Sequence, residues 1–362
     1  MTLSIEVLTT LLYLLQSRRR LSHRARQLLL QSFFPRARHV IFFKSGRSAL
    51  SAVFEALARE QRGVQVLVPD YICNVVPRAV SRAGLEAVSY RTTEGFEIDL
   101  DDLLEKVAKP SVAAVVLASL FGAQNTSQTV VDRIRRARND VLLVLDDCQN
   151  LLLNRAVVPD ARTVVVFSFN MKTITGSMGG GVCLGDNGFD LQPPEMNQLR
   201  DFRLECAIGM LFLKQVCLRA WRSIGKRLGR RVYKPPCLEY SHATGRIHYD
   251  MVPQRIAKLS LARAITRMRT AAETESLRKR NFEALSGFLQ QTGAGEVVST
   301  HCTASAPFVP VRLVKPALLT LMPWKGPYGL EGSPHKTLRP ELLYFKNDGL
   351  DQFSTLVREG SD

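Results

Sequence analysis

The sequence predicts an α/β fold with a mostly parallel central sheet in a large domain, followed by a small α+β domain. Between about residues 39 and 184, short segments that are continuously apolar alternate with helical segments. Strands of this kind are buried on both faces, which is typical of a parallel sheet covered by helices. The chain has 362 residues and is 46% hydrophobic, so it can bury a large core.

The predicted elements follow one another in a regular order. One amphipathic helix is predicted from the N-terminus to about Ser32. The predicted strands are 39–43, 64–69, 86–90, 112–120, 141–147 and 163–169, with a later one at 308–314. The predicted helices are 45–60, one that ends near Arg82, 99–108 and 130–138. We therefore expect an N-terminal basic helical segment at 1–38, a large domain at 39–250 and a small domain at 251–362.

Charge and cysteine content limit the class of protein. The formal net charge of +16 favours anionic partners, and the cations cluster at 18–26 and 219–231. The seven cysteines show no CxxC pair and no Cys/His ligand pattern, so neither a disulfide scaffold nor a metal is implied. No signal peptide or bilayer-spanning segment is expected. The sequence predicts a cytoplasmic protein, with peripheral contact at the inner membrane surface as an open alternative.

The residues that follow the predicted strands are candidates for a site, because ligands bind at the carboxyl ends of parallel strands. SGRSAL, from Ser45, opens a helix whose backbone N–H groups, with the Ser48 hydroxyl, would hold a phosphate. An ordinary serine cap is the alternative. Asp147 ends the strand VLLVLDD, where a buried carboxylate needs a cation such as a protonated ring nitrogen. A helix-capping aspartate is the alternative.

Lys172 stands alone between an apolar strand and a glycine-containing turn in FSFNMKTITGSMGGGVCL. Poor solvation of an ammonium group lowers its pKa, which a lysine needs in order to form an imine. A phosphate site, an acid on a middle strand and a lysine after the next strand follow in the order seen in pyridoxal-phosphate (PLP) enzymes of the aspartate-aminotransferase fold. Their order carries more weight than any one of them.

The run from about Lys44 to Leu184 resembles the DegT/StrS family of sugar aminotransferases, which have fold type I. Members of that family carry an SGT-like helix start, a VP-x-Y segment, an LFG-like turn, an acid segment and SFxxxK before a glycine turn. The corresponding segments here are SGRSAL, VPDY, LFG, LDDCQN, SFNMK and TGSMGG. The resemblance covers about half of the chain, and the C-terminal part is shortened and matches poorly.

The resemblance assigns roles to individual residues. It makes Lys172 the Schiff-base lysine and proton shuttle, and Asp147 the partner of the pyridine nitrogen. Gln149 would lie beside the cofactor ring. The phosphate-binding residues would be Gly46, Arg47, Ser48 and Ser168. Because Lys172 is present, the sequence does not resemble the dehydratase branch of the family, in which that lysine is replaced.

Two segments depart from the family pattern. An aromatic residue usually covers the cofactor ring, and here alignment places Cys73, or Tyr71 if the loop shifts. The NYRMS-like segment that reaches across the dimer to the phosphate is HYDMV here, so His248 replaces an asparagine. Its imidazole would donate to the phosphate, and a solvated loop histidine is the alternative.

The segment from Met210 to about residue 228 has apolar residues every three or four positions and basic residues between them, within a helix expected at about 207–231. Packing against the protein's own core or a dimer mate is one interpretation. Attachment to a membrane surface is another, and the N-terminal segment repeats the pattern. Nucleic-acid binding is disfavoured, because no recognised motif accompanies the charge.

The sequence therefore predicts a PLP-dependent aminotransferase. It would act as a homodimer that moves an amino group from glutamate or glutamine to a keto-sugar nucleotide or a related ketone. Elimination, decarboxylation or carbon–carbon bond formation by the same lysine and acid is the first alternative. A non-catalytic anion-binding or scaffold protein that keeps the fold is the second.

Overall fold

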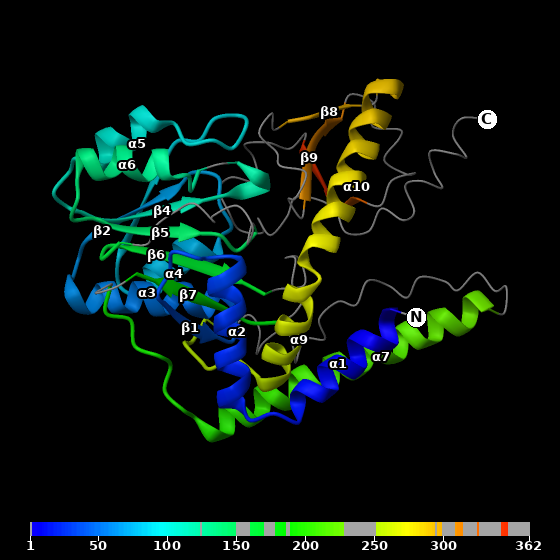
Figure 1. Ribbon diagram of the computed structural model, residues 1–362. Helices are drawn as coiled ribbons and strands as arrows, with labels where there is room; N and C mark the ends of the chain where they lie inside the picture. Colours follow the sequence, from blue (N-terminus) through cyan, green and yellow to red (C-terminus); the bar gives the residue numbers. More distant parts are fainter. Residues whose placement is uncertain are drawn as a thin grey trace.

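The computed structural model describes residues 2–123, 125–149, 160–169, 178–185, 189–227, 251–293, 295–298, 308–313, 324–325 and 342–346. Within these ranges the chain forms a large α/β layer structure, a long helical arm and a second small sheet (Figure 1).

The N-terminal segment is not the single helix that the sequence predicts. It forms two helices, α1 (Thr2–Leu14) and α2 (Arg18–Ser32). Ser17 has an extended backbone, and its side-chain oxygen accepts a hydrogen bond from the backbone N–H of Arg20 at 3.3 Å. A serine cap of this kind satisfies the start of a new helix, so α1 ends before it and the chain turns.

The large sheet has seven strands in the order β1-β7-β6-β5-β4-β2-β3. Their bounds are β1 His39–Phe43, β2 Gln65–Pro69, β3 Glu86–Tyr90, β4 Val112–Ala118, β5 Leu142–Asp146, β6 Thr163–Ser168 and β7 Gly180–Leu184. Strands β3, β2, β4, β5 and β6 pair in parallel, whereas β7 is antiparallel to both β6 and β1. The predicted mostly parallel sheet is confirmed.

The sequence does not predict strand β7, because its glycines are typical of a turn. Gly180 and Gly181 instead begin the strand, between β1 and β6. A Cβ built on Gly181 would lie 2.5 Å from the Ile41 carbonyl oxygen and 2.5 Å from the Phe167 ring. Glycine is needed here because neighbouring backbone and an aromatic ring occupy the space of a side chain.

Gly180→Ala is expected to destabilise the fold by about 2–3 kcal/mol. Its Cβ would lie 2.5 Å from the Phe167 carbonyl oxygen and 2.6 Å from the nitrogen of Gly46, the first residue of α3 (Gly46–Glu60), so β6 and the start of α3 would have to shift. Urea unfolding measures the change. The control is Gly209→Ala, whose Cβ meets nothing within 4 Å and should be neutral or slightly stabilising. Equal stability of the two variants would contradict the prediction.

Helices cover both faces of the large sheet (Figure 1). Helices α3 (Gly46–Glu60) and α4 (Val75–Arg82) lie on one face, and α5 (Leu100–Val107) and α6 (Gln128–Ala137) on the other. The buried strands divide their side chains between two cores: Leu143 of β5 belongs to the α5/α6 side, and Val144 to the α3/α4 side. This explains the continuously apolar strand sequences.

The remaining described elements form the helical arm and the small sheet. Helix α7 spans Gln198–Arg227, beginning earlier than the predicted 207, and α9 (Lys258–Arg269) is followed by α10 (Ala271–Thr292). Helices α1 and α2 both pack on α9. A four-stranded sheet has the order β10-β11-β9-β8, with bounds Trp324–Lys325, Leu342–Lys346, Phe308–Leu313 and Gly295–Val297.

Candidate active site

The strand-end site, which we define as Gly46, Asp147, Cys148, Ser168 and Gly180, brings together segments far apart in sequence. The Asp147 N–H donates to the Val166 carbonyl oxygen of β6 at 2.8 Å, which aligns the ends of β5 and β6. A Cβ built on Gly46 would lie 2.8 Å from the Cys148 Sγ and 3.2 Å from the Ser168 Cβ. The start of α3 therefore contacts the carboxyl ends of both strands.

Asp147 is a buried acid to which no described residue donates a hydrogen bond. Its side chain is 0% exposed, and within the described ranges neither carboxylate oxygen has a hydrogen-bond donor. Burial raises the pKa of the Asp147 carboxyl well above its usual range, and the nearby Asp146 raises it further. A buried group of this kind is costly, and a cationic ligand that donates a hydrogen bond would offset the cost.

Cys148 is a site residue that the sequence interpretation did not single out. Its backbone N–H donates to Asp146 Oδ1 at 3.1 Å, which fixes the turn after β5. Burial raises the pKa of the Cys148 thiol well above its usual value, with Asp146, Asp147 and Cys73 adding to the effect. The signal in the sequence was its place directly after the two acids at a strand end.

Helix α3 begins with the cap that the sequence suggested. Ser45 Oγ accepts a hydrogen bond from the Ser48 N–H at 3.2 Å. The first N–H groups of a helix have no acceptor within it, and the helix dipole makes its start attractive to anions. Arg47 lies half-buried in this first turn. The start of α3 thus combines an anion-attracting backbone with a position beside the strand ends.

The Ser48 hydroxyl, which the sequence assigned to a phosphate, is used inside the chain. It donates to the Val252 carbonyl oxygen at 2.8 Å and accepts from the Gln254 N–H at 3.1 Å. Next to it, the buried Lys44 donates from Nζ to Gln254 Oε1 at 3.3 Å. Ser48 therefore fixes residues 252–254 over the start of α3, a long-range contact that no local sequence pattern reveals.

Tyr71 packs into an aromatic cluster. Its ring centroid lies 5.1 Å from that of Phe96, which lies 4.8 Å from that of Phe121. Both phenylalanines have positive φ, 65° and 52°, a strained conformation that surrounding contacts must hold. Gln149 helps to hold it, because its Oε1 accepts from the Phe121 N–H at 3.3 Å.

Asn125 fixes the same cluster to the end of β4. Its Nδ2 donates to the carbonyl oxygens of Phe96 at 2.7 Å and Ala118 at 3.0 Å, and its Oδ1 accepts from the Ile98 N–H at 3.1 Å. Of the two candidates for covering a ring, Tyr71 is thus held in the cluster. Cys73 is the one within electrostatic reach of Cys148.

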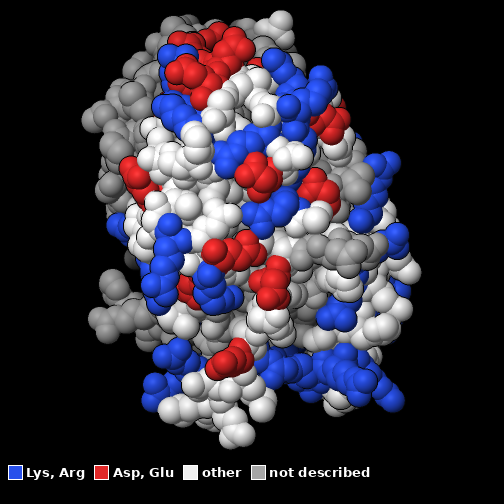
Figure 2. All heavy atoms as spheres, turned by 90° about the vertical axis from the view of Figure 1, so that its left-hand side faces the viewer, with Lys and Arg blue, Asp and Glu red and all other residues white. Residues whose placement is uncertain are grey.

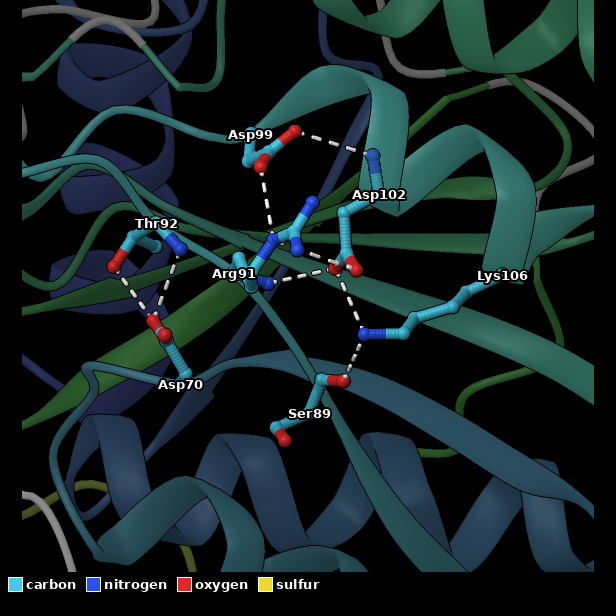
Figure 3. A network of polar contacts seen from close by, with 7 residues as sticks. All are labelled: Asp70, Ser89, Arg91, Thr92, Asp99, Asp102 and Lys106. Carbon is cyan, nitrogen blue, oxygen red and sulfur yellow. Dashed lines mark hydrogen bonds and ion pairs between the residues drawn. The ribbon is translucent and has the colours of Figure 1, made fainter.

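Asp70, the acid after β2, serves a structural network (Figure 3). Its Oδ1 accepts from the Thr92 N–H at 3.0 Å and from Thr92 Oγ1 at 2.6 Å. Beside it, Asp102 accepts from the Arg91 N–H and from Lys106 Nζ, both at 2.8 Å. These contacts tie the chain after β3 to α5 and to the end of β2, so Asp70 is a positioning residue for the loop.

Two predicted site residues, Lys172 and His248, lie outside the described residues. Their roles stay predictions. In the part of the chain that the structure describes, no group of three or more His, Cys, Asp or Glu side chains is placed to hold a metal ion.

Comparison with known proteins finds two sequence similarities, both limited to part of the chain. Residues 15–147 match the family model for aminotransferase class I and II. A protein described as "probable glycine dehydrogenase (decarboxylating) subunit 2", from Shouchella clausii (strain KSM-K16), is 34% identical over 143 residues. That similarity covers 38% of this chain and 28% of the relative, so the chain spans only a minor part of the relative's length.

Solved structures are similar over most of the chain. 3-Amino-5-hydroxybenzoic acid synthase is 14% identical with a TM-score of 0.60, covering 94% of this chain and 91% of that one. The GDP-4-keto-6-deoxy-D-mannose-3-dehydratase of E. coli, with bound hydrated PLP, is 17% identical with a TM-score of 0.60, covering 92% and 90%. NtdA from Bacillus subtilis, with the bound cofactor PMP, is 14% identical with a TM-score of 0.60, covering 98% and 81%. The predicted fold type I of PLP-dependent transferases is confirmed.

Proposed function

We propose that this protein is a PLP-dependent aminotransferase. The observation that carries the proposal is Asp147, a buried carboxylate at the carboxyl end of β5 to which no described residue donates a hydrogen bond. When bound, PLP supplies an electron-accepting pyridinium ring that stabilises negative charge on a substrate carbon. Its ring N–H would give Asp147 the charge and hydrogen bond that no described residue supplies.

The residues of the strand-end site fit the rest of the cofactor. The helix start at Gly46 would face the phosphate, with Arg47 and Ser168 beside it. Ser48 would act indirectly, because its hydroxyl holds residues 252–254 against the same turn. The absence of a side chain at Gly46 lets the start of α3 approach Cys148 and Ser168 closely. Gln149 and Cys73 would lie near the ring.

The protein's own chemical steps in this proposal belong to two side chains. Asp147 would hold the ring nitrogen protonated, because a positive charge next to the buried carboxyl favours its ionised form and the ring N–H donates a hydrogen bond to it. Lys172 would bind the cofactor covalently and, once released, would move a proton between the donor's α-carbon and the cofactor. The nearby Asp146 raises the pKa of the Asp147 carboxyl, and Asp147 in turn raises the pKa of the Cys148 thiol.

We propose glutamate or glutamine as donor and a keto-sugar nucleotide or related ketone as acceptor. The donor and the acceptor rest on the resemblance to sugar aminotransferases. One of the similar structures is an enzyme named for a nucleotide-linked keto-sugar, which supports an acceptor of this class. The similarity to a decarboxylating glycine dehydrogenase subunit keeps decarboxylation as the competing reaction.

An absorption spectrum of the purified protein tests the proposal. We expect a visible band from the bound cofactor, and conversion to the amine form of the cofactor on adding glutamate or glutamine. Only transamination returns the cofactor as the amine, whereas decarboxylation would release carbon dioxide. A protein that lacks the band after incubation with PLP would contradict the proposal and favour a non-catalytic role.

We also propose that the protein is a homodimer, in which the segment around His248 and Tyr249 completes the partner's phosphate site. Sedimentation at the assay concentration should give twice the mass of the 40.4 kDa chain. Full activity of a monomer would contradict the proposal.

A further inference from the structure

Two helices of the arm expose an unusual amount of apolar surface. Every large hydrophobic side chain that is exposed among the described residues lies within 8–15 or 196–213, that is, in or beside α1 and α7. In α1 and the residue after it these are Leu8, Leu11, Leu12 and Leu15, which are 47–83% exposed. In α7 they are Leu199, Phe202, Met210 and Leu213, which are 60–67% exposed. We call these eight side chains the apolar ridge.

The apolar ridge is the outer face of helices whose inner face is already packed. Leu204 and Ile208 of α7 are buried with Leu259 of α9, and Leu14 of α1 joins the same cluster. Helices α1 and α7 both pack on α9. A helix that is apolar on both faces is normally covered on both. Among the described residues, the core therefore does not cover the side of α7 that carries Leu213. Packing of this side against a dimer mate stays a prediction.

The charge around the apolar ridge is positive. Arg19, Arg20, Arg24 and Arg26 of α2 are exposed just after Leu15, and Arg200 and Arg203 are exposed within α7. The three acids of the two ridge helices each have a partner: Glu6 pairs with Arg267 at 2.9 Å, Glu205 pairs with Arg18 at 2.5 Å, and Asp201 Oδ1 accepts from Gln254 Nε2 at 3.4 Å. Glu195 is an exposed acid nearby. Figure 2 shows Lys and Arg gathered along the lower edge of the molecule, where few acids lie between them.

A hollow in the surface of α2 adjoins the apolar ridge. It is lined by Gln16, next to Leu15, and by Arg20, His23 and Arg24, with further glutamines along the helix. Amide and guanidinium groups that face one hollow suit an anionic headgroup. Apolar side chains and anion-binding groups thus lie next to each other.

We propose that this surface docks on a lipid bilayer that contains anionic lipid. The apolar ridge would enter the boundary between headgroups and acyl chains, and the arginines around it would meet lipid phosphates. The chain would lie on the bilayer, since no helix among the described residues has the length and apolar character to cross it. The proposal is independent of the reaction that the strand-end site performs.

The charges favour a bilayer over the other occupants of such a surface. A second copy docked by two-fold symmetry would bring the same patch to itself, so the arginine clusters would oppose each other. A nucleic acid would meet the arginines but leave the apolar ridge unmatched, because its affinity comes from phosphates. An anionic bilayer complements both the charge and the apolar side chains.

Co-sedimentation of the full, PLP-treated protein with vesicles tests the proposal. We expect binding to vesicles of phosphatidylcholine with phosphatidylglycerol, weaker binding at high salt, and little binding to phosphatidylcholine alone. Leu12→Ser with Leu15→Ser should weaken binding at least about tenfold without lowering thermal stability, because both side chains are at least half exposed.

A charge-matched pair of variants isolates the role of the arginines. Arg19→Gln with Arg20→Gln should weaken binding about thirtyfold. Arg133→Gln with Arg136→Gln removes the same charge from exposed positions on α6, at the other end of the molecule, and should change binding little. Equal losses from both pairs, equal binding to neutral vesicles, or no vesicle binding would overturn the proposal. The proposal would also be overturned if the leucine variant lost self-association but kept vesicle binding.

Discussion

Lys172→Ala is expected to abolish covalent retention of PLP and to lower turnover by roughly 10⁴-fold or more, the loss typical of a group that takes part in bond formation. The visible band of the cofactor should disappear or shift to that of free PLP. The cause is the loss of the only amine that the sequence places between the end of β6 and the start of β7.

Borohydride reduction followed by peptide mapping identifies the lysine directly. In the wild-type protein the label should lie in the peptide that contains Lys172. Lys106→Ala is a suitable control, since Lys106 bonds to Asp102 and Ser89 in the loop network and should keep the band. A label on Lys44, the buried lysine beside Ser45, would refute the assignment.

Asp147→Asn is expected to lower turnover roughly 10²- to 10³-fold while keeping some PLP bound. The amide has nearly the same shape, but it carries no charge to hold the ring nitrogen protonated. Measurement of kcat at saturating donor, with cofactor content determined in the same samples, separates lost chemistry from lost cofactor. Near wild-type turnover would mean that Asp147 is structural and that Asp146 or no acid serves the ring.

Asp147→Asn is expected to lower turnover, but in the cofactor-free protein it should raise the free energy of unfolding. Burial raises the pKa of Asp147 in the folded state, above an unfolded value of about 3.9. The folded protein then binds more protons than the unfolded one above that pH, so its stability falls as the pH rises. The Asp147→Asn variant has no carboxyl group to ionise at this position, so it does not lose stability in this way. It should be more stable than the wild type by about 1–3 kcal/mol at pH 8.

Urea unfolding of both cofactor-free proteins at several pH values measures this difference. It should shrink as the pH falls to about 3, below the unfolded pKa of about 3.9, where the carboxyl group is mostly neutral in both states. Asp146, whose pKa burial also raises, remains in both proteins, so its contribution largely cancels. A wild-type protein that is more stable than the variant at pH 8 would show that Asp147 has a partner within the protein. PLP should reverse the order, because it binds the wild type more tightly.

The order of strands and helices in the large domain could be predicted from local sequence. Continuously apolar segments such as Val112–Ala118 are buried on both faces, and a parallel sheet is the arrangement that buries them. The place of Asp147 and Ser168 followed as well, because residues after parallel strands share one edge of the sheet. Helix caps such as Ser45 depend on side chains within the same turn, so a short motif is enough to indicate them.

Contacts between distant segments were decided only by the tertiary structure. Gly180 and Gly181 read as a turn because glycine is common there, and only the close approach of β1 and β6 explains them as a strand. Ser48 could not be linked in advance to Val252 and Gln254, more than 200 residues away. A periodic pattern predicts an apolar helix face, but it does not show what covers that face. The structure shows that α9 packs on the opposite face of α7 and that Leu213 is exposed.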